Sequence, residues 1–532
     1  MKREDSLHRV KSQHEPWDVL VIGGGATGLG TALDAASRGL SALLLEQHDF
    51  AKGTSSRSTK LVHGGVRYLA QGDIALVREA CYERGLLQKN ARHLVKNETF
   101  VIPSYNWWTK PFYTIGLTMY DLLAGSLSLG RSLPVSRNDA MRRLPTVKKE
   151  NLRGGVKYHD GQFDDSRLAV NIAETTEELG GTVVNYMKVT GLLKTNGKVS
   201  GVTAIDQESG EAYTIDAKTV VNATGVFVDD ILSMDEPEHK NMVRPSQGVH
   251  LVLDKEFLPG EDALMIPKTS DGRVLFAVPW HDKVVVGTTD TPLDEHSLEP
   301  KALEEEIEFI LATAKQYLTK APSRADVKSV FAGLRPLAAP QGNSQKTKEI
   351  SRSHKLLVSK SGLLTMTGGK WTTFRKMAED TIDKAVKIGQ LSAKECGTQN
   401  LAIHGSEQTY PFDDPMYFYG SDKARILQLV KENARFGEKI HPNQPYLIAE
   451  IVWAVRNEMA RTIEDFLSRR TRALLLDARA SIDMAPVVAE VMAAELGKDG
   501  AWISEQIDTY IQLANRYLLV KYQPVFTETE HN

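Results

Sequence analysis

Three glycines near the start of the chain, Gly23, Gly25 and Gly28, have the G-x-G-x-x-G spacing with which proteins bind the phosphates of a dinucleotide. They follow four apolar residues, 19–22, that predict a short buried strand, and a helix is predicted over about 25–37. The first glycine permits a tight turn, the second lets the backbone approach a pyrophosphate, and the third lets helix and strand pack closely. The N–H groups at the helix N-terminus would then bind the phosphates.

An acidic residue stands where such a unit binds ribose. A second predicted strand, 41–45, ends directly before Glu46, about 20 residues beyond the last glycine. A carboxylate there accepts both ribose hydroxyls of the nucleotide and would repel a 2′-phosphate. Because strand, helix and acid are in register, the stretch predicts a Rossmann-type βαβ unit rather than a glycine-rich turn in an ordinary α/β protein.

The composition is that of a soluble globular protein, with 41% hydrophobic and 25% charged residues. A chain of 532 residues is too long for one core and predicts roughly two to four domains. The net charge of -3 gives no general reason to expect a nucleic-acid partner. The only cysteines, Cys81 and Cys396, exclude a disulfide framework or a cysteine zinc site and predict a reducing cytosol. Residues 1–16 are charged and lack an apolar core, so they predict a frayed leader rather than a signal peptide.

The next part of the chain predicts further α/β structure. Residues 53–69 are rich in hydroxyl groups, glycine and basic residues, as expected of a loop and helix start that meet phosphate and a polar ring. Helices are predicted over about 73–90 and 164–180, the second capped by Asp165 or Ser166. The strands that follow are predicted at 182–187, in a β-meander with turns at 195–197 and 208–210, and at 219–222.

Residues 244–330 have the pattern of antiparallel strands and predict a different domain inserted into the first. The α/β pattern returns with strands at 353–359 and 363–367, followed by a glycine turn that opens a predicted helix at 374–388. Beyond about residue 391 the chain is predicted to be mostly helical, with one apolar stripe at 451–467.

Residues 107–129 form the most lipid-like stretch. A lysine, a proline and an aspartate interrupt it, so it falls short of the roughly 20 clean apolar residues that a spanning helix needs. The stretch predicts chiefly a buried helix that packs on another domain. The alternative is an interfacial patch, because Trp107, Trp108 and Tyr113 suit a headgroup boundary.

The order of these elements favours FAD over NAD, because a hydroxyl-rich stretch, a meander, a strand ending in Ala-Thr-Gly and a final strand-turn-helix follow the first βαβ unit. The sequence resembles the FAD-dependent glycerol-3-phosphate dehydrogenases, with the α-glycerophosphate oxidases as close relatives. The resemblance covers nearly the whole chain and is carried by GGGATGLG (23–30), TSSRSTKLVHGGVRYL (54–69), VVNATGVFVD (220–229), RPSQGVHLV (244–252), VVVGTTDTP (284–292), AGLRPL (332–337), TGGKWTTFRKMAED (367–380) and EDFLSRRTR (464–472). The second, sixth and seventh motifs together are specific, because a generic flavoprotein would show the first but not all of those.

The resemblance implies a fold and a division into domains. The expected fold class is α/β, or α+β for the chain as a whole, with a Rossmann-like FAD-binding domain of the glutathione-reductase and D-amino-acid-oxidase type, an antiparallel substrate domain and a C-terminal helical domain. The FAD-binding domain is expected in three parts, 1–90, 151–240 and 331–390. The other expected parts are a membrane-facing segment of the substrate domain at 91–150, the antiparallel domain at 241–330 and the helical domain at 391–532.

The resemblance also implies which residues contact FAD. The expected contacts are Ile22, Gly23, Gly25, Ala26, Thr27, Gly28, Glu46, Gln47, Thr54, Ser55, Ser56, Ser58, Thr59, Lys60, Leu61, His63, Gly64, Gly65, Val189, Ala223, Thr224, Gly225, Gly333, Arg335, Gly368, Gly369, Lys370, Trp371, Thr372 and Thr373.

A substrate with a phosphate dianion needs converging cations, of which arginine makes a forked contact and lysine serves as a point charge. Arg67, Arg335 and Lys370 lie far apart in sequence, yet each follows or interrupts a glycine-containing turn, as loops that meet at one pocket would. The resemblance places all three, with Tyr68, at the substrate end of the flavin. Taken singly, each would be an ordinary surface cation in a chain with 65 lysines and arginines.

Oxidation of a secondary alcohol requires a base for the hydroxyl proton while a hydride leaves for flavin N5, and histidine titrates in the right range. His63, in the HGG sequence, and His250, in GVHL, are the candidates. His63 could instead orient the flavin, and His250 could be a satisfied core histidine. Lys370 competes if neighbouring cations depress its pKa. The expected catalytic set is therefore His63, His250, Arg335 and Lys370, with the identity of the base left open.

The resemblance implies oxidation of sn-glycerol 3-phosphate to glycerone phosphate by hydride transfer to FAD. The sequence lacks the long insertion characteristic of the oxidases, which favours a quinone over oxygen as the electron acceptor. The alternatives are an oxygen-using glycerophosphate oxidase, an oxidase of an amine or a 2-hydroxy acid, and a redox-silent FAD protein that binds a partner. We expect a cytoplasmic protein without a metal or a nucleic-acid partner. A peripheral contact with the inner face of the plasma membrane and a homodimer are both left open.

Overall fold

The computed structural model describes residues 1–66, 72–269, 272–338 and 354–524. The described α-helices are α1 (Arg3–Ser12), α2 (Ala26–Ser37), α4 (Ile74–Asn90), α5 (Thr109–Ala124), α6 (Arg137–Arg143), α7 (Asp165–Glu178), α8 (Val228–Asp235), α9 (Glu304–Tyr317), α10 (Phe374–Gly389), α11 (Lys423–Glu432), α12 (Ile448–Asn457), α13 (Ala473–Leu476), α14 (Ala478–Leu496) and α15 (Gly500–Ala514). The described strands are β1 (Trp17–Ile22), β2 (Ala42–Leu45), β3 (Leu61–Val62), β4 (Val95–Pro103), β5 (Leu133–Val135), β6 (Gly155–Phe163), β7 (Thr182–Val184), β8 (Met187–Thr195), β9 (Lys198–Asp206), β10 (Ala212–Asn222), β11 (Val243–Asp254), β12 (Ala263–Ile266), β13 (Leu275–Trp280), β14 (Lys283–Gly287), β15 (Thr291–Pro292), β16 (Val327–Ala338), β17 (Lys355–Val358) and β18 (Leu364–Thr367).

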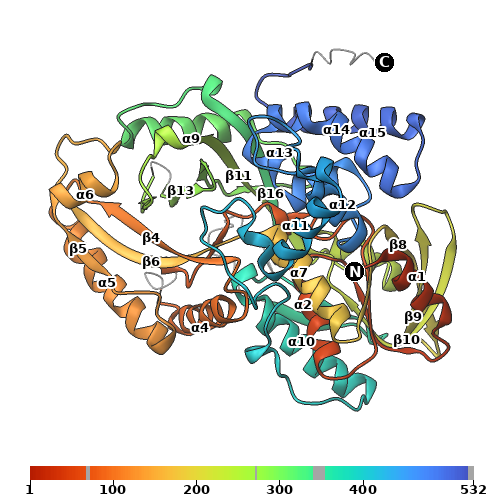
Figure 1. Cartoon of the computed structure of the whole chain (residues 1–532). Coiled ribbons are helices and arrows are strands. Elements are labelled where there is room, and N and C mark those ends of the chain that lie inside the picture. The colour runs from red at the N-terminus through yellow and green to blue at the C-terminus, as the bar shows by residue number, and fades with distance from the viewer. Residues whose placement is uncertain (67–71, 270–271, 339–353, 525–532) are drawn as a thin grey trace, which may run out of the picture.

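The first sheet contains the βαβ unit predicted from the glycine motif. Its order is β17-β18-β10-β1-β2-β7, and the hairpin of β8 and β9 extends from β10. β1 pairs in parallel with both β2 and β10. Val19 and Val21 are buried in the cluster formed with α2, α7 and α10 (Figure 1), whereas Leu20 and Ile22 are buried against the meander on the other face. Burial on both faces explains the continuous apolar run of this strand.

The second sheet has ten strands in the order β15-β11-β14-β13-β12-β4-β6-β3, with β16 also paired to β11 and β5 to β6. Its described pairs are antiparallel, except that β4 and β12 are parallel. Helices α6 and α9 pack on one face and α5 on the other. β6 belongs to this sheet although it lies in a segment predicted to bind FAD. The domain boundaries themselves stay predictions.

The long pair of β11 and β16 determines which residues face the site. Its register sets Ser246 opposite Arg335 and His250 opposite Phe331. Because side chains alternate along a strand, His250 and Arg335 project from the same face of the sheet. Their neighbours in sequence, such as Val249, project from the other face into the apolar cluster that contains α9.

Helices α11 to α15 form the C-terminal part, of which Figure 1 shows α14 and α15 on the opposite side of the molecule from α5. The apolar stripe predicted at 451–467 is largely buried, but it does not lie on one helix. α12 ends at Asn457, Met459 has a left-handed φ of 54°, and the π-helix η11 (Asp465–Arg470) follows. A single helical period therefore does not describe this segment.

The N-terminal residues are not the frayed leader predicted from their charge, and that prediction is wrong. They form helix α1, whose Arg3 is buried and donates from Nη2 to Asp206 Oδ1 at 2.6 Å. Ser6 donates from Oγ to Glu177 Oε1 at 2.5 Å. These contacts hold the helix against the meander and α7, so its charged residues are part of the interface.

The N-cap of α7 is Asp164, and not Asp165 or Ser166 as predicted. The Asp164 side chain accepts a hydrogen bond from the backbone N–H of Arg167. Asp165 is buried and instead accepts from the Nζ of Lys60, with both oxygens at 2.8 Å. The carboxylate that the sequence assigned to capping therefore fixes the hydroxyl-rich segment beside the glycine motif.

Helix α5 occupies the stretch predicted as a buried helix or an interfacial patch. Its inner side buries Leu117, Tyr120 and Ala124. The exposed apolar side chains on it and just before it are Trp107, Trp108, Phe112, Ile115, Met119 and Leu122. Only one side of the helix is thus buried. None of the described helices is long and apolar enough to span a membrane.

His404 joins the C-terminal part of the chain to α7. Its Nδ1 lies 2.6 Å from Glu178 Oε1, and its Nε2 lies 2.7 Å from Asp422 Oδ2. Burial alone would lower the pKa of His404, but the charge of Glu174 and the hydrogen bonds to Asp422 and Glu178 outweigh burial and raise the pKa to about 11. The imidazolium is therefore the form present at neutral pH.

We expect His404→Gln to lower the thermal unfolding midpoint most near pH 6. The raised pKa stabilises the folded state fully below the ordinary value of 6.5, and this contribution is lost as the pH rises toward about 11. The measurement is the difference in midpoint between wild type and variant at about pH 6 and about pH 10, and this difference should shrink at the higher pH. An equal difference at both pH values would show that His404 acts through packing alone.

Candidate active site

A cavity of about 680 Å³ is lined by residues of both sheets and of the loops between them. Its volume lies in the usual range for a cofactor or substrate site. The predicted site residues that line it are Ile22, Gly23, Gly25, Ala26, Thr27, Glu46, Gln47, Thr54, Ser55, Ser58, Thr59, Leu61, His63, Gly65, Val189, Ala223, Thr224, Gly225, His250, Gly333, Arg335, Gly368, Gly369, Lys370, Trp371 and Thr372. Segments that lie far apart in the sequence, between Ile22 and Met377, therefore meet at one site.

The glycine turn brings the backbone of α2 to this cavity. Gly23 has a φ of 108°, and a Cβ on it would lie 2.8 Å from the carbonyl oxygen of Ala223. A Cβ on Gly28 would lie 1.8 Å from the carbonyl oxygen of Gly23, so this glycine allows helix and strand to pack closely. Gly25 is the N-cap of α2 and has no side chain to cover the helix N-terminus. The turn therefore leaves backbone N–H groups open to an anion.

Glu46 is held at the end of β2 by two backbone N–H groups. Its Oε2 accepts from Gly24 N at 2.6 Å, and its Oε1 accepts from His48 N at 2.8 Å. The side chain lines the cavity, and each oxygen retains a further acceptor position. This geometry fits a ribose diol.

Five predicted contacts lie behind the cavity wall rather than on it, namely Gly28, Ser56, Lys60, Gly64 and Thr373. Lys60 is fully buried, and its Nζ donates to the Ser56 carbonyl oxygen at 2.6 Å and to Asp165. Gly64 donates its backbone N–H to Tyr120 Oη at 2.7 Å. These residues support the wall and make no contact with the cavity itself.

Several lining residues were missed by the sequence analysis. They include Lys52, Arg57, Phe100, Tyr158, Asp160, Met265, Phe276 and Thr288. The Phe100 ring stacks on Tyr158 with centroids 5.1 Å apart and meets Phe276 edge-on at 5.9 Å. The alternation of Tyr158 and Asp160 on β6 would have placed them on one face, but no local pattern reveals that this face lines the cavity. Thr288 lies in the VVVGTTDTP motif, which was a usable signal.

Arg335 is held in one orientation on this wall. Its Nη2 donates to Thr288 Oγ1 and to the Thr289 carbonyl oxygen, each at 3.1 Å, and its Nη1 lies 3.4 Å from Asp290 Oδ1. Gly248 makes room for the guanidinium, because a Cβ there would lie 2.3 Å from Nη2. The side chain is a quarter exposed and lines the cavity. A fixed, forked cation is therefore presented to a ligand.

His250 lies near Arg335 on the same face. Its Nε2 is 2.8 Å from Thr59 Oγ1, and its ring stacks on Phe331 with centroids 4.8 Å apart. Burial, followed by the positive charges of Arg335 and Lys60, lowers the pKa of His250 well below 6.5. The imidazole is therefore neutral at neutral pH and able to accept a proton.

His63, which follows β3, and Lys370, which follows β18, line the same cavity. The backbone N–H of His63 donates to Thr372 Oγ1 at 3.2 Å, which ties the HGG turn to the turn that contains Lys370. The other two residues predicted at the substrate end, Arg67 and Tyr68, lie outside the described residues.

The turn after His63 is also tied to α5. Gly64 donates its N–H to Tyr120 Oη, and Tyr120 Oη donates to Asp160 Oδ1 at 2.8 Å. The same carboxylate oxygen accepts from Arg84 Nη1 at 2.5 Å. All three of these side chains are buried. The helix with the exposed apolar side therefore also positions the turn at the cavity.

The donor set of the cavity fits a flavin dinucleotide, because an open helix N-terminus and a ribose-binding carboxylate line the same space as polar residues from the second sheet. Comparison with known proteins agrees. Residues 18–375 match the family model described as FAD dependent oxidoreductase. Residues 396–502 match the model described as C-terminal domain of alpha-glycerophosphate oxidase.

Relatives and a solved structure cover almost the entire chain. The mitochondrial glycerol-3-phosphate dehydrogenase of Bos taurus is 39% identical over 95% of this chain and 74% of its own length. That of Schizosaccharomyces pombe is 39% identical over 94% and 87%. The crystal structure of the glycerol-3-phosphate dehydrogenase from Bacillus halodurans complexed with FAD is 30% identical, with a TM-score of 0.79 over 98% of this chain and 99% of that one. The chain is an FAD-dependent enzyme and belongs to the family of glycerol-3-phosphate dehydrogenases.

Proposed function

We propose that this enzyme oxidises sn-glycerol 3-phosphate to glycerone phosphate and passes the electrons to a quinone. The observation that carries the proposal is that Arg335 and the neutral His250 lie on the same face of the second sheet. Both line the cavity that the FAD-binding motif also lines. A cation that can fork onto a phosphate and a base that can take a hydroxyl proton are the two groups that a phosphorylated alcohol requires.

The roles of the chain's own residues follow from this geometry. The glycine turn and Glu46 would hold FAD, which would supply the hydride acceptor when bound. Arg335, fixed by Thr288 and Thr289, binds the phosphate and orients the secondary alcohol. His250 takes the hydroxyl proton at Nε2, directly or through the hydroxyl of Thr59.

Binding of the substrate phosphate should also change the proton affinity of His250. The positive charge of Arg335 contributes to the lowered pKa of His250 in the protein alone. A phosphate dianion bound to Arg335 offsets that charge and raises the proton affinity of the imidazole. Substrates without a phosphate lack this effect, so phosphate binding and proton removal favour the same substrate.

The experiment that tests the proposal is the flavin absorption spectrum before and after anaerobic addition of sn-glycerol 3-phosphate. The oxidised flavin bands should bleach, and a water-soluble quinone should restore them faster than oxygen does. Bleaching by an amine or a 2-hydroxy acid, but not by glycerol 3-phosphate, would favour the related oxidases. A flavin that none of these compounds reduces would indicate a redox-silent protein.

Glu46→Gln should weaken FAD retention. An amide is a weaker acceptor for ribose hydroxyls than a carboxylate, and charge-assisted hydrogen bonds contribute about 1.5 to 3 kcal/mol. The measurement is the ratio of flavin to protein absorbance after dialysis at low FAD. Glu178→Gln, which changes a carboxylate on α7 that does not line the cavity, is the matched control. An unchanged ratio in Glu46→Gln would remove this residue from the ribose site.

We further propose that the protein is cytoplasmic and docks peripherally on the inner face of the plasma membrane, where a quinone is reached. The support is the exposed apolar side of α5 and the aromatic residues before it. The exposed fraction is 74% for Trp107 and 82% for Trp108. The guanidinium of Arg153 lies 4.2 Å from the Trp107 ring centroid, so a basic group accompanies the apolar one. Such a face suits a headgroup boundary with anionic lipid.

The protein should therefore pellet with anionic vesicles at low salt and be released at high salt, because a surface contact assisted by basic groups is screened. Replacement of Trp107 and Trp108 by alanine together should abolish pelleting. The matched control is Leu357→Ala, which removes an exposed apolar side chain on β17. Pelleting that survives the double replacement would place the contact elsewhere, with the C-terminal helices as the next candidate.

A further inference from the structure

The segment that follows β2, residues 46–54, forms much of the cavity wall near the glycine turn, and we call it the nucleotide loop. Residues 46–53 of this loop belong to no helix or strand, and Thr54 begins a single 3-10 turn, so hydrogen bonds of regular secondary structure do not fix the shape of the loop. Ala51 has a left-handed φ of 60°, and its N–H donates to the Gly24 carbonyl oxygen at 2.9 Å. Such a backbone persists only where its surroundings fix it, so the source of that constraint matters for the adenosine end of FAD.

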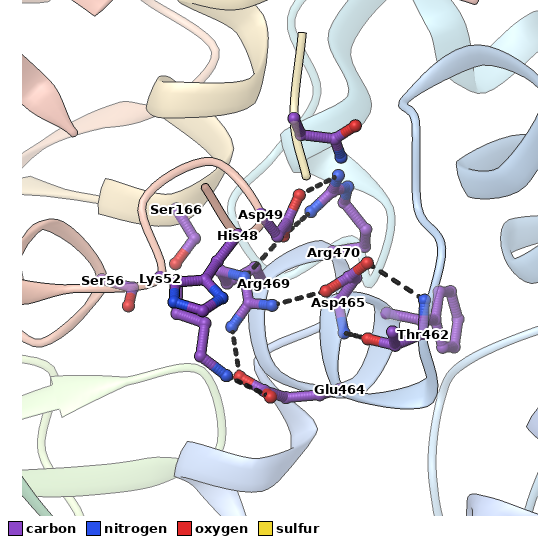
Figure 2. Close-up of polar contacts among 12 residues, drawn as sticks. His48, Asp49, Lys52, Ser56, Ser166, Thr462, Glu464, Asp465, Arg469 and Arg470 are labelled. Carbon is purple, nitrogen blue, oxygen red and sulfur yellow. Dashed lines mark hydrogen bonds and ion pairs between the residues drawn. The ribbon is translucent and has the colours of Figure 1, made fainter. Parts of the chain in front are cut away.

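Much of the constraint comes from the C-terminal part of the chain. Figure 2 shows Asp49 of the nucleotide loop between two arginines of the π-helix η11. Arg470 makes a forked contact with Asp49, with Nη1 to Oδ2 at 2.6 Å and Nη2 to Oδ1 at 2.9 Å, and Arg469 Nε lies 2.5 Å from Oδ2. Asp49 and Arg470 are fully buried, and Arg469 is nearly so.

A second ion pair lies three residues after Asp49, toward the end of the loop. Lys52 donates to Glu464, which in turn accepts from Arg469 Nη1 at 2.8 Å. Arg469 Nη2 donates to Asp465 Oδ1 at 2.7 Å. Arg469 therefore contacts Asp49 directly and also Glu464, the partner of Lys52, so it joins the two ion pairs of the loop (Figure 2). Arg469 and Arg470 are adjacent in sequence on this π-helix, and both contact the same carboxylate, that of Asp49.

These ion pairs are not contacts with the ligand. Within the described residues, no residue beyond Met377 lines the cavity, whereas Glu46, Gln47, Ala51 and Lys52 of the loop do. Burial of charged groups costs desolvation energy. Apolar residues of similar volume would therefore hold two parts of a chain together as strongly as buried ion pairs do. Forked, charge-assisted contacts add a fixed direction, which apolar packing does not. The network is therefore suited to fixing the shape of the loop.

We propose that Arg469 and Arg470 are positioning residues for FAD. They hold Asp49, and with it the nucleotide loop, in the shape that presents Glu46 and the backbone to the adenosine end of the cofactor. The C-terminal part thus belongs to the cofactor site although it lends no described residue to the cavity lining. Loss of the forked contact would loosen the loop and weaken the hold on the adenosine end of FAD, whereas the residues of the second sheet that line the cavity would be unchanged.

The test is the rate of FAD release from the holoenzyme of Arg470→Lys, followed by flavin fluorescence after dilution. Lysine keeps the charge but cannot fork onto Asp49, so release should be about tenfold faster or more. The FAD-free full-length chain should bind ADP, which carries the adenosine and pyrophosphate, more weakly by the same factor. Its affinity for FMN, which carries the ring, should not change.

Two further variants separate positioning from general stability. Val488→Ala opens the buried core of α14 without touching the loop, so it should lower the unfolding midpoint and leave FAD release close to wild type. Arg469→Lys keeps the Arg470 contact and serves if Arg470→Lys does not fold. Equal acceleration of FAD release in the arginine variant and in Val488→Ala, or equal weakening of ADP and FMN, would overturn the proposal.

Discussion

Arg335→Lys is expected to lower kcat/KM for sn-glycerol 3-phosphate by about ten- to a hundredfold while FAD remains bound. Lysine keeps the positive charge but lacks the planar guanidinium, in which one nitrogen can bind Thr288 while the others fork onto a phosphate, and the loss corresponds to about 1.5 to 3 kcal/mol of transition-state stabilisation. Steady-state kinetics and the flavin spectrum together measure it. The matched control is Arg244→Lys on the neighbouring strand, whose partner Asp294 is exposed and which does not line the cavity.

The same substitution should matter far less for glycerol, which has no phosphate. The preference for the phosphorylated substrate should therefore shrink in Arg335→Lys. Equal losses on both substrates would mean that Arg335 acts on the reacting carbon or on the flavin. If neither falls, Arg335 has no part in substrate binding.

His250→Asn is expected to reduce kcat by about 10²- to 10⁴-fold, the range that general base catalysis contributes. Asparagine can still accept a hydrogen bond from Thr59 but cannot take a proton. Because burial and the charges of Arg335 and Lys60 lower the pKa of His250, kcat/KM of the wild type should stay level through the pH range in which an ordinary histidine titrates and fall only at more acid pH. That acid limb should be absent from the residual activity of the variant.

His63→Asn is the comparison that identifies the base. His63 lines the cavity on the HGG turn, and its backbone is fixed by Thr372, so its loss should perturb the flavin spectrum more than the pH profile. The assignment of His250 fails if His63→Asn removes the acid limb and His250→Asn keeps it. Loss of the limb in neither variant would point to Lys370.

The sequence predicts the nucleotide-binding half well because its signals are local. The glycine spacing, the strand before it and Glu46 all lie within one βαβ unit, and each occupies the expected place. The confirmed family resemblance likewise identified His250 and Arg335 as candidates. Their approach to one another depends on the register of β11 and β16, which are separated by other strands in the sequence.

The misses have non-local causes. Asp160 and Tyr158 reach the cavity because β6 pairs with β4 and β3, and nothing near either residue signals those pairings. The charges of residues 1–16 predict a solvent-exposed leader, whereas Arg3 of helix α1 is buried and pairs with Asp206 in the meander. The stripe at 451–467 is broken between the end of α12 at Asn457 and the start of η11 at Asp465, where Met459 has a left-handed φ, and hydrophobic periodicity does not signal such a break.

The register of β11 and β16 makes the spacing of the chain as important to this enzyme as the identity of its residues. Along β16, Phe331, Gly333 and Arg335 face the cavity side, whereas Val330 and Ala332 face the apolar cluster against α9. A single-residue deletion within this strand would turn the guanidinium into a hydrocarbon layer without changing one functional side chain. Such a shift in strand register should prevent folding rather than merely slow turnover, because burial of an unpaired arginine charge lowers the stability of the folded state. We therefore expect this strand to tolerate substitutions within it, but insertions or deletions only beyond its ends.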